Sequence, residues 1–138
     1  MPKKALINLT EPMFYVLMAF RNGPLCGTDI ASNVNELTSG RVNIGPATLY
    51  TLLAKFQEAG YIYEVDKNVA GRKRTYVLSK DGLKAYSDEI KRLQRCLIDA
   101  QTIEKMKQEI IEENNENTIK EKTFKYDPEK YRNPGQGR

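Results

Sequence analysis

The chain has 138 residues, 40% of them hydrophobic, which is enough for one small domain with an appendage. Its formal net charge of +4 is compatible with a polyanionic partner but does not identify one. Because the sequence contains no histidine, no paired cysteines, no clustered carboxylates and no glycine-rich phosphate loop, we expect neither an enzyme with catalytic residues nor a metal site or cofactor.

The N-terminal segment, residues 1–9, carries Lys3 and Lys4. Two interpretations of these lysines remain open: a basic arm that contacts phosphates, or residues that only keep the terminus soluble. The segment lacks the apolar run of a signal peptide, and no stretch approaches the roughly 20 apolar residues of a membrane span. We therefore expect a cytoplasmic protein with no membrane partner.

The first predicted helix begins at Thr10, an N-cap residue, with Pro12 in its first turn. It ends at Asn22-Gly23-Pro24. Its residues are apolar nearly all round, which indicates burial on more than one face. In so small a chain this favours contact with a partner as well as with the core, and Phe14 and Leu17 are the candidates for that contact.

A second, shorter helix is predicted from about Cys26 to Thr38, with a narrow apolar stripe. Cys26 has no adjacent base or cation, so a packed apolar role is favoured over a reactive thiol. Residues 41–44 then alternate between polar and apolar side chains, which predicts a short strand.

A third helix is predicted between Pro46 and Gly60, because proline suits a first helical position and glycine a helix end. Leu49, Leu52 and Phe56 follow helical spacing and mark its core face. The opposite face carries small and hydroxylated side chains with little negative charge in its first turns. Free N–H groups and the helix dipole favour an anion there, although an ordinary solvated face remains the alternative.

Residues 61–66 and 74–78 alternate with period two, which predicts a hairpin whose connecting segment is basic. The order is then helix, helix, short strand, helix, hairpin. This is the order of a winged helix-turn-helix, so we expect a mainly α (α+β) fold of that type.

The candidate DNA contacts lie on the third helix and the hairpin. Arg72, Lys73 and Arg74 would bind phosphates, which positions a protein on DNA without reading sequence. The other candidates are Asn43, Ala47, Thr48, Tyr50, Thr51 and Lys55. Three alternatives stay open: Tyr50 as a boundary aromatic between helix and hairpin, Thr48 bonded to the local backbone, and Asn43 as a residue that shapes the turn.

A long helix is predicted over residues 79–113, with Ser79 as its N-cap. Apolar side chains step along it by three and four residues, with a small shift of phase near residue 103. Such a stripe exceeds what one small domain covers, so the helix predicts a homodimer. The expected interface residues on it are Leu83, Tyr86, Ile90, Leu93, Leu97, Ile103, Met106 and Ile110.

From Asn114 onward the periodicity fails, and the sequence to Arg138 is polar with proline and glycine. We expect residues 114–138 to form a disordered tail. The expected organisation is thus a DNA-binding domain over 1–78, a dimerisation helix over 79–113 and this tail.

Several motifs together resemble the PadR family of bacterial transcriptional regulators. They are Pro46-Ala47-Thr48-Leu49-Tyr50, Ala59-Gly60-Tyr61-Ile62, Gly71-Arg72-Lys73-Arg74 with Tyr76-Val77-Leu78-Ser79, and Gly23-Pro24-Leu25-Cys26-Gly27. Cys26 stands where the family usually has histidine, and Thr28 where an aromatic is common. The resemblance covers about residues 6–100, and the single long helix is similar to the short-chain subgroup.

The resemblance implies a homodimer joined through the last helix, often with help from the first, that binds a pseudo-palindromic operator in double-stranded DNA, usually as a repressor. In some relatives a hydrophobic effector binds between the paired long helices. Tyr86, Ile90, Leu93 and Leu97 would line that space here, although ordinary dimer packing also explains them. The competing function is a winged-helix adaptor that binds another protein without sequence-specific DNA binding.

Overall fold

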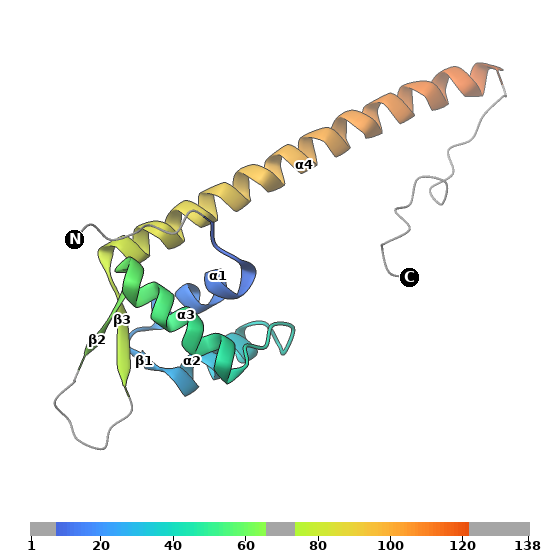
Figure 1. Ribbon diagram of the computed structural model, residues 1–138. Coiled ribbons are helices and arrows are strands. Elements are labelled where there is room, and N and C mark those ends of the chain that lie inside the picture. Colours follow the sequence, from blue (N-terminus) through green and yellow to red (C-terminus); the bar gives the residue numbers. More distant parts are fainter. Residues whose placement is uncertain (1–7, 66–73, 122–138) are drawn as a thin grey trace. The chain divides into compact units, whose positions relative to one another are not determined.

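The computed structural model describes residues 8–65 and 74–121. Its elements are α1 (Glu11–Ala19), a 3₁₀ turn (Phe20–Asn22), β1 (Leu25–Cys26), α2 (Gly27–Leu37), α3 (Pro46–Ala59), β2 (Ile62–Val65), β3 (Thr75–Leu78) and α4 (Lys80–Glu121), as Figure 1 shows. The chain divides into two compact units, Met1–Leu93 and Gln94–Arg138. These elements confirm the prediction of a mainly helical winged helix-turn-helix followed by a long last helix.

Local chemistry sets the ends of the helices as the sequence predicts. The Thr10 hydroxyl accepts a hydrogen bond from the Met13 amide at 3.3 Å, and the Met13 sulfur accepts one from the Thr10 amide. Pro46 occupies the first turn of α3, and Gly60 ends that helix in the left-handed conformation with φ of 78°. Glycine adopts this conformation without the steric cost that a Cβ atom would bring.

A three-stranded antiparallel sheet follows the helix-turn-helix, in the order β1-β3-β2. Leu25 pairs with Tyr76, and Ile62 pairs with Leu78. The strand predicted at residues 41–44 is wrong, because those residues form an irregular turn between α2 and α3. The third strand comes instead from β1, ahead of α2.

The hydrophobic core lies where the three short helices meet the sheet. Its fully buried side chains are Val16, Leu17, Ile30, Val34, Leu53 and Phe56. Leu17 is 0% exposed, so its side chain has no surface left for a second chain, and its predicted place in a dimer interface is wrong. Phe14 is half-buried, and its ring stacks on that of Tyr86 with centroids 5.5 Å apart.

Helix α4 begins in close contact with the sheet. A Cβ atom on Gly82 would lie 2.1 Å from the carbonyl oxygen of Tyr61, so only glycine fits there. The helix continues to Glu121, so its predicted end at Glu113 is wrong. The prediction of a disordered tail is therefore also wrong for residues 114–121, which belong to this helix. Residues 122–138, the rest of that predicted tail, lie outside the described residues. Among the described helices, none has the length and apolar character needed to cross a membrane.

Candidate nucleic-acid interface

The face of α3 that points away from the core has the character predicted for a DNA-reading helix. Its candidate residues Ala47, Thr48, Tyr50, Thr51 and Lys55 are all exposed. The first turn contains no acidic residue, and the N-cap Gly45 makes no side-chain hydrogen bond to the helix. The amides at this end therefore lack a side-chain cap, which suits an approaching anion.

The two threonines of this face differ in their local bonding. The Thr51 hydroxyl donates a 3.0 Å hydrogen bond to the carbonyl oxygen of Ala47, one turn earlier. Its oxygen retains lone pairs that can accept from a DNA base. Thr48 is exposed and does not lie near the core face, so its side chain is open to solvent.

Tyr50 joins α3 to the start of α2 and to the hairpin. A Cβ atom on Gly27 would lie 3.4 Å from the Tyr50 ring and hydroxyl, so the ring passes over the first residue of α2. A pocket of about 370 Å³ lies beside it, lined by Gly27, Thr28, Tyr50, Arg74 and Tyr76. Tyr50 is still 59% exposed, so it fills part of this boundary and retains surface that a partner could contact.

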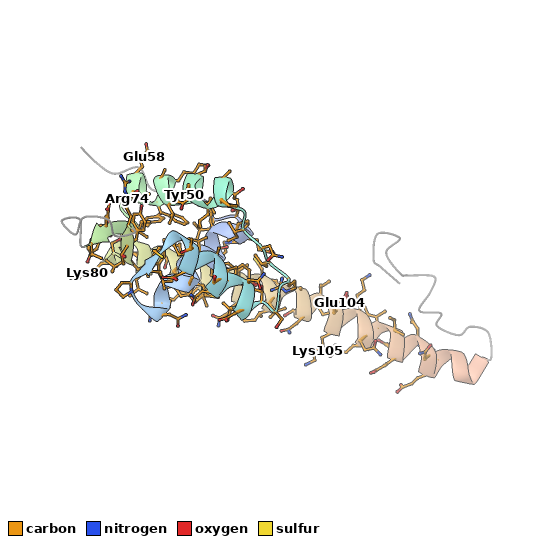
Figure 2. The ribbon with its side chains drawn as sticks, turned by 90° about the horizontal axis from the view of Figure 1, so that it is seen from below. Tyr50, Glu58, Arg74, Lys80, Glu104 and Lys105 are labelled. Atoms are coloured by element: carbon orange, nitrogen blue, oxygen red, sulfur yellow. The ribbon has the colours of Figure 1, made fainter. Side chains whose placement is uncertain are left out.

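Arg74 is the one hairpin cation among the described residues (Figure 2). Its side chain is 75% exposed, and its Nε atom lies 4.0 Å from the Glu64 carboxylate. At that distance and exposure the ion pair is weak, so the guanidinium remains available to a phosphate. Lys3, Lys4, Arg72 and Lys73, also predicted as DNA contacts, lie outside the described residues.

Asn43 is engaged within the turn between α2 and α3. Its side-chain oxygen accepts a hydrogen bond from the Asn35 amide, and its own amide donates one to the Gly40 carbonyl oxygen at 3.0 Å. These bonds support the turn-shaping alternative for Asn43. The turn borders a pocket of about 510 Å³ lined by Ala31, Ser32, Asn35, Glu36, Asn43, Ile44 and Gly45.

The same turn carries a cation that the sequence did not single out. Arg41 donates a 2.8 Å hydrogen bond to the Tyr15 hydroxyl and lies over that ring, 5.7 Å from its centroid. The bond to Tyr15 raises the pKa of Arg41, so its charge is fixed at all accessible pH. No local pattern predicts this contact, since it joins α1 to a turn distant in sequence.

The remaining predicted interface residues lie on α4 and retain exposed surface to different degrees. Tyr86 and Ile90 are half-buried. Leu83 and Leu93 are 38% and 39% exposed, and Leu97, Ile103, Met106 and Ile110 are 50–57% exposed. Within the described residues, no group of three or more histidine, cysteine or acidic side chains is placed to hold a metal ion.

Comparison with solved structures supports the winged-helix fold. A transcriptional regulator from Clostridium thermocellum superimposes with a TM-score of 0.56 at 24% identity, covering 63% of this chain and 88% of that one. RosR from H. salinarum gives 0.55 at 18% identity, covering 79% and 96%. ZitR, a zinc-responsive MarR family member from Lactococcus lactis, gives 0.51 at 17% identity, covering 87% and 81%.

No curated protein sequence matches the chain. The sequence model of the transcriptional regulator PadR-like family does match, over residues 16–88. That range runs from α1 through α2, α3 and the hairpin into the first turns of α4, so it contains the candidate interface on α3 and the hairpin. It also spans more than half of the chain, which therefore belongs to the PadR-like family of transcriptional regulators, as a DNA-binding regulator and not an enzyme.

Proposed function

We propose that the chain is a homodimeric repressor that binds a pseudo-palindromic operator through α3 and the hairpin. The observation that carries the proposal is the exposed face of α3, which has hydroxyls and no carboxylate in its first turns. Arg74 stands beside that face across the pocket under Tyr50. Hydroxyls can bond bases or phosphates, whereas a carboxylate would repel the backbone.

The dimer follows from the apolar side chains that α4 leaves uncovered. Leu93, Leu97, Ile103, Met106 and Ile110 are each at least 39% exposed. A stripe of this kind on a monomer marks an interaction surface, and a two-fold dimer is the commonest way to cover one. Two copies of α3 would then meet successive major grooves about 34 Å apart.

Selection from a random DNA pool, followed by anisotropy titration at two salt concentrations, tests the proposal. The selected sequence should bind about 10³-fold or more tightly than random DNA. Arg74→Ala should weaken binding to both and should reduce the salt slope by about 0.9 per subunit, since one phosphate contact is lost. Lys84→Ala, which removes an equal charge from α4, is the matched control.

Equal affinity for selected and random DNA would contradict sequence-specific regulation. Function that stays intact after Arg72, Lys73 and Arg74 are neutralised together would favour the adaptor. In vitro transcription tests the sign of regulation: the protein should lower the yield from a promoter that contains the selected site. A higher yield would show an activator.

The proposal includes a hydrophobic effector that enters between the paired α4 helices. Tyr86, Ile90, Leu93 and Leu97 would line its site, and all four retain surface in the single chain. A planar hydrophobic probe should bind the dimer and lower its affinity for DNA. Leu97→Ala should change the affinity for the probe more than the affinity for DNA. If no such probe binds, the effector site is contradicted, and dimer packing alone explains these residues.

A further inference from the structure

The pocket of about 370 Å³ beside Tyr50 lies where three elements meet. Its lining residues are Gly27 and Thr28 at the start of α2, Tyr50 on α3, Tyr76 on β3 and Arg74 just before that strand. Tyr50 and Arg74 are labelled in Figure 2. Small-molecule sites have volumes of roughly 300–1,000 Å³, so this pocket is large enough to hold a small ligand.

Tyr76 is the most deeply buried of the side chains that line this pocket. Only 5% of its surface is exposed, and its side chain forms no hydrogen bond within residues 8–65 and 74–121. Every fully buried side-chain oxygen or nitrogen in that part of the chain does have a hydrogen-bond partner. The Tyr76 hydroxyl is therefore not sealed off, and the small surface that it retains opens into the pocket that Tyr76 lines. A hydroxyl held there by a buried ring is placed to bond a ligand atom.

Three further hydrogen-bond donors surround the pocket. The Arg74 guanidinium is only weakly paired, since its Nε atom lies 4.0 Å from the Glu64 carboxylate and its side chain is 75% exposed. The Tyr50 hydroxyl lies 3.4 Å from the position that a Cβ atom on Gly27 would take. The Gly27 amide begins α2, where the N-cap Cys26 makes no side-chain hydrogen bond and the helix dipole is positive. Donors from three elements therefore converge, which favours a ligand rich in acceptor oxygens.

A phosphate monoester satisfies these donors and the walls of the pocket. The planar guanidinium of Arg74 can bind two phosphate oxygens at once, and helix N-termini bind phosphate through their amides. One phosphate group would leave much of the volume empty, and the remaining walls include the rings of Tyr50 and Tyr76. Tyrosine rings stack on flat heterocycles such as nucleobases. The pocket thus fits a phosphate attached to a flat ring.

Two carboxylates near the pocket limit the affinity of such a ligand without blocking its site. Glu64 competes for Arg74, but at 4.0 Å and with the arginine exposed that attraction is weak. Asp29 accepts a hydrogen bond from the Cys26 thiol and is not one of the lining residues that the structure describes. Removing the Glu64 charge should therefore tighten binding, an effect opposite in sign to the loss of Arg74.

We infer that this pocket is a binding site for a small phosphate monoester with a flat ring, the class to which nucleoside monophosphates belong. Its phosphate bonds Arg74, the Tyr76 hydroxyl and the Gly27 amide, and its ring stacks on Tyr50. The site is separate from the proposed hydrophobic site on α4 and does not require a second chain. Arg74 and Tyr50 also belong to the proposed DNA interface, so the ligand competes with DNA, a consequence that rests on the proposed function.

Calorimetric titration of the full chain with adenosine monophosphate (AMP) tests the site. Binding should saturate at one ligand per chain and be tighter than about 1 mM, and adenosine or inorganic phosphate should each bind at least about tenfold more weakly. Tyr76→Phe, which keeps the buried ring, should weaken binding of AMP about three- to tenfold, and Arg74→Gln about tenfold or more. Glu64→Gln should tighten it about two- to threefold. The matched control is Tyr63→Phe, which removes a hydroxyl from the opposite face of β2 and should leave the affinity for AMP unchanged.

The affinity for DNA distinguishes a free ligand from a backbone phosphate of DNA as the occupant of the pocket. Tyr76→Phe should leave the affinity for the selected DNA within about twofold of the parent, because the hydroxyl lies too deep to meet a duplex. AMP should displace the selected DNA from the parent, and about three- to tenfold more AMP should be needed with Tyr76→Phe.

Weaker DNA binding by Tyr76→Phe, together with no binding of AMP, would assign the pocket to a DNA phosphate and overturn the inference. No saturable binding of AMP, or an equal affinity for inorganic phosphate, would also overturn it and would leave the proposed repressor intact. A protein that binds AMP with these variant effects, yet has no preference for the selected DNA, would support the site and contradict the proposed function.

Discussion

Single contacts decide what a substitution should cost at several positions of this chain. Gly82 is buried where α4 begins, and the Tyr61 carbonyl that a Cβ atom would strike is fixed by a 2.9 Å hydrogen bond from the Ser79 amide. Gly82→Ala should therefore lower the free energy of unfolding by about 2–3 kcal/mol, measured by urea denaturation. A loss below about 0.5 kcal/mol would show that the carbonyl moves freely.

Gly45→Ala is the matched control for that substitution. Gly45 has an ordinary negative φ, and a Cβ atom on it would meet nothing within 4 Å. Alanine lowers the conformational entropy of the unfolded chain, which stabilises the fold, but it caps the helix less well than glycine, which destabilises it. Because the two effects oppose each other, we expect the free energy of unfolding to change by no more than about 0.5 kcal/mol.

The ion pair between Glu89 and Arg92 gives α4 a dependence on pH. The two side chains approach to 2.6 Å, and the hydrogen bond from Arg92 lowers the pKa of Glu89. A carboxylate with a depressed pKa stabilises the fold above its unfolded pKa, and this contribution is lost as pH falls. Relative to Glu89→Gln, the parent should be more stable by about 0.5 kcal/mol at pH 7, a difference that disappears well below pH 4.3.

Thermal unfolding from pH 7 to pH 3 measures this difference. Glu36→Gln, at an exposed position on α2 that forms no ion pair within the described residues, should follow the parent at every pH. A Glu89→Gln curve that parallels the parent throughout would exclude a stabilising pair.

At the scale of the elements, Tyr50 brings α3 into contact with the first residue of α2, Gly27. Tyr50→Phe keeps the ring over Gly27 and removes only the hydroxyl, so stability should stay within about 0.5 kcal/mol. If the hydroxyl binds DNA, affinity for the operator should fall about three- to tenfold, the value of one hydrogen bond. Anisotropy titration measures this change.

Tyr63 offers a matched control, since it is 55% exposed on β2 and Tyr63→Phe removes the same group. Equal affinities for the parent and Tyr50→Phe would assign Tyr50 to packing alone, the alternative that its sequence position also allows.

The extent of each element was predictable where local chemistry decides it. Thr10, Pro46 and Gly60 mark helix ends in the sequence, and the structure confirms all three. Residues 41–44 misled the prediction because Val42 and Ile44 are buried in an alternating pattern without belonging to a strand. Alternation reports which side chains face the core, whereas a strand also requires a partner for its backbone, and β1 occupies that place.

For the whole molecule, the exposed stripe on α4 predicts that a substitution that prevents dimerisation also weakens DNA binding. Leu93 is 39% exposed, and Leu93→Glu would place a charge in the proposed interface. Sedimentation should then show a monomer, and operator affinity should fall at least a hundredfold because one half-site remains per molecule. The fold should persist, as the far-ultraviolet circular dichroism spectrum would show.

Leu37→Glu is the control for this change, because Leu37 is 58% exposed at the end of α2, outside the proposed interface. It should remain dimeric. If the Leu93→Glu protein sediments as a dimer like the parent, the proposal that the α4 helices form the interface is contradicted.

The sequence by itself determined the helix ends at Thr10, Pro46 and Gly60, the hairpin strands, the apolar stripe of α4 and the motifs of the family, because each depends on residues close together in the chain. Only the tertiary structure decided that Leu17 is internal, that β1 completes the sheet, and that Tyr50 lies over Gly27. Those outcomes join residues far apart in sequence, and burial and pairing at such distances follow from packing of the whole domain and not from local preference.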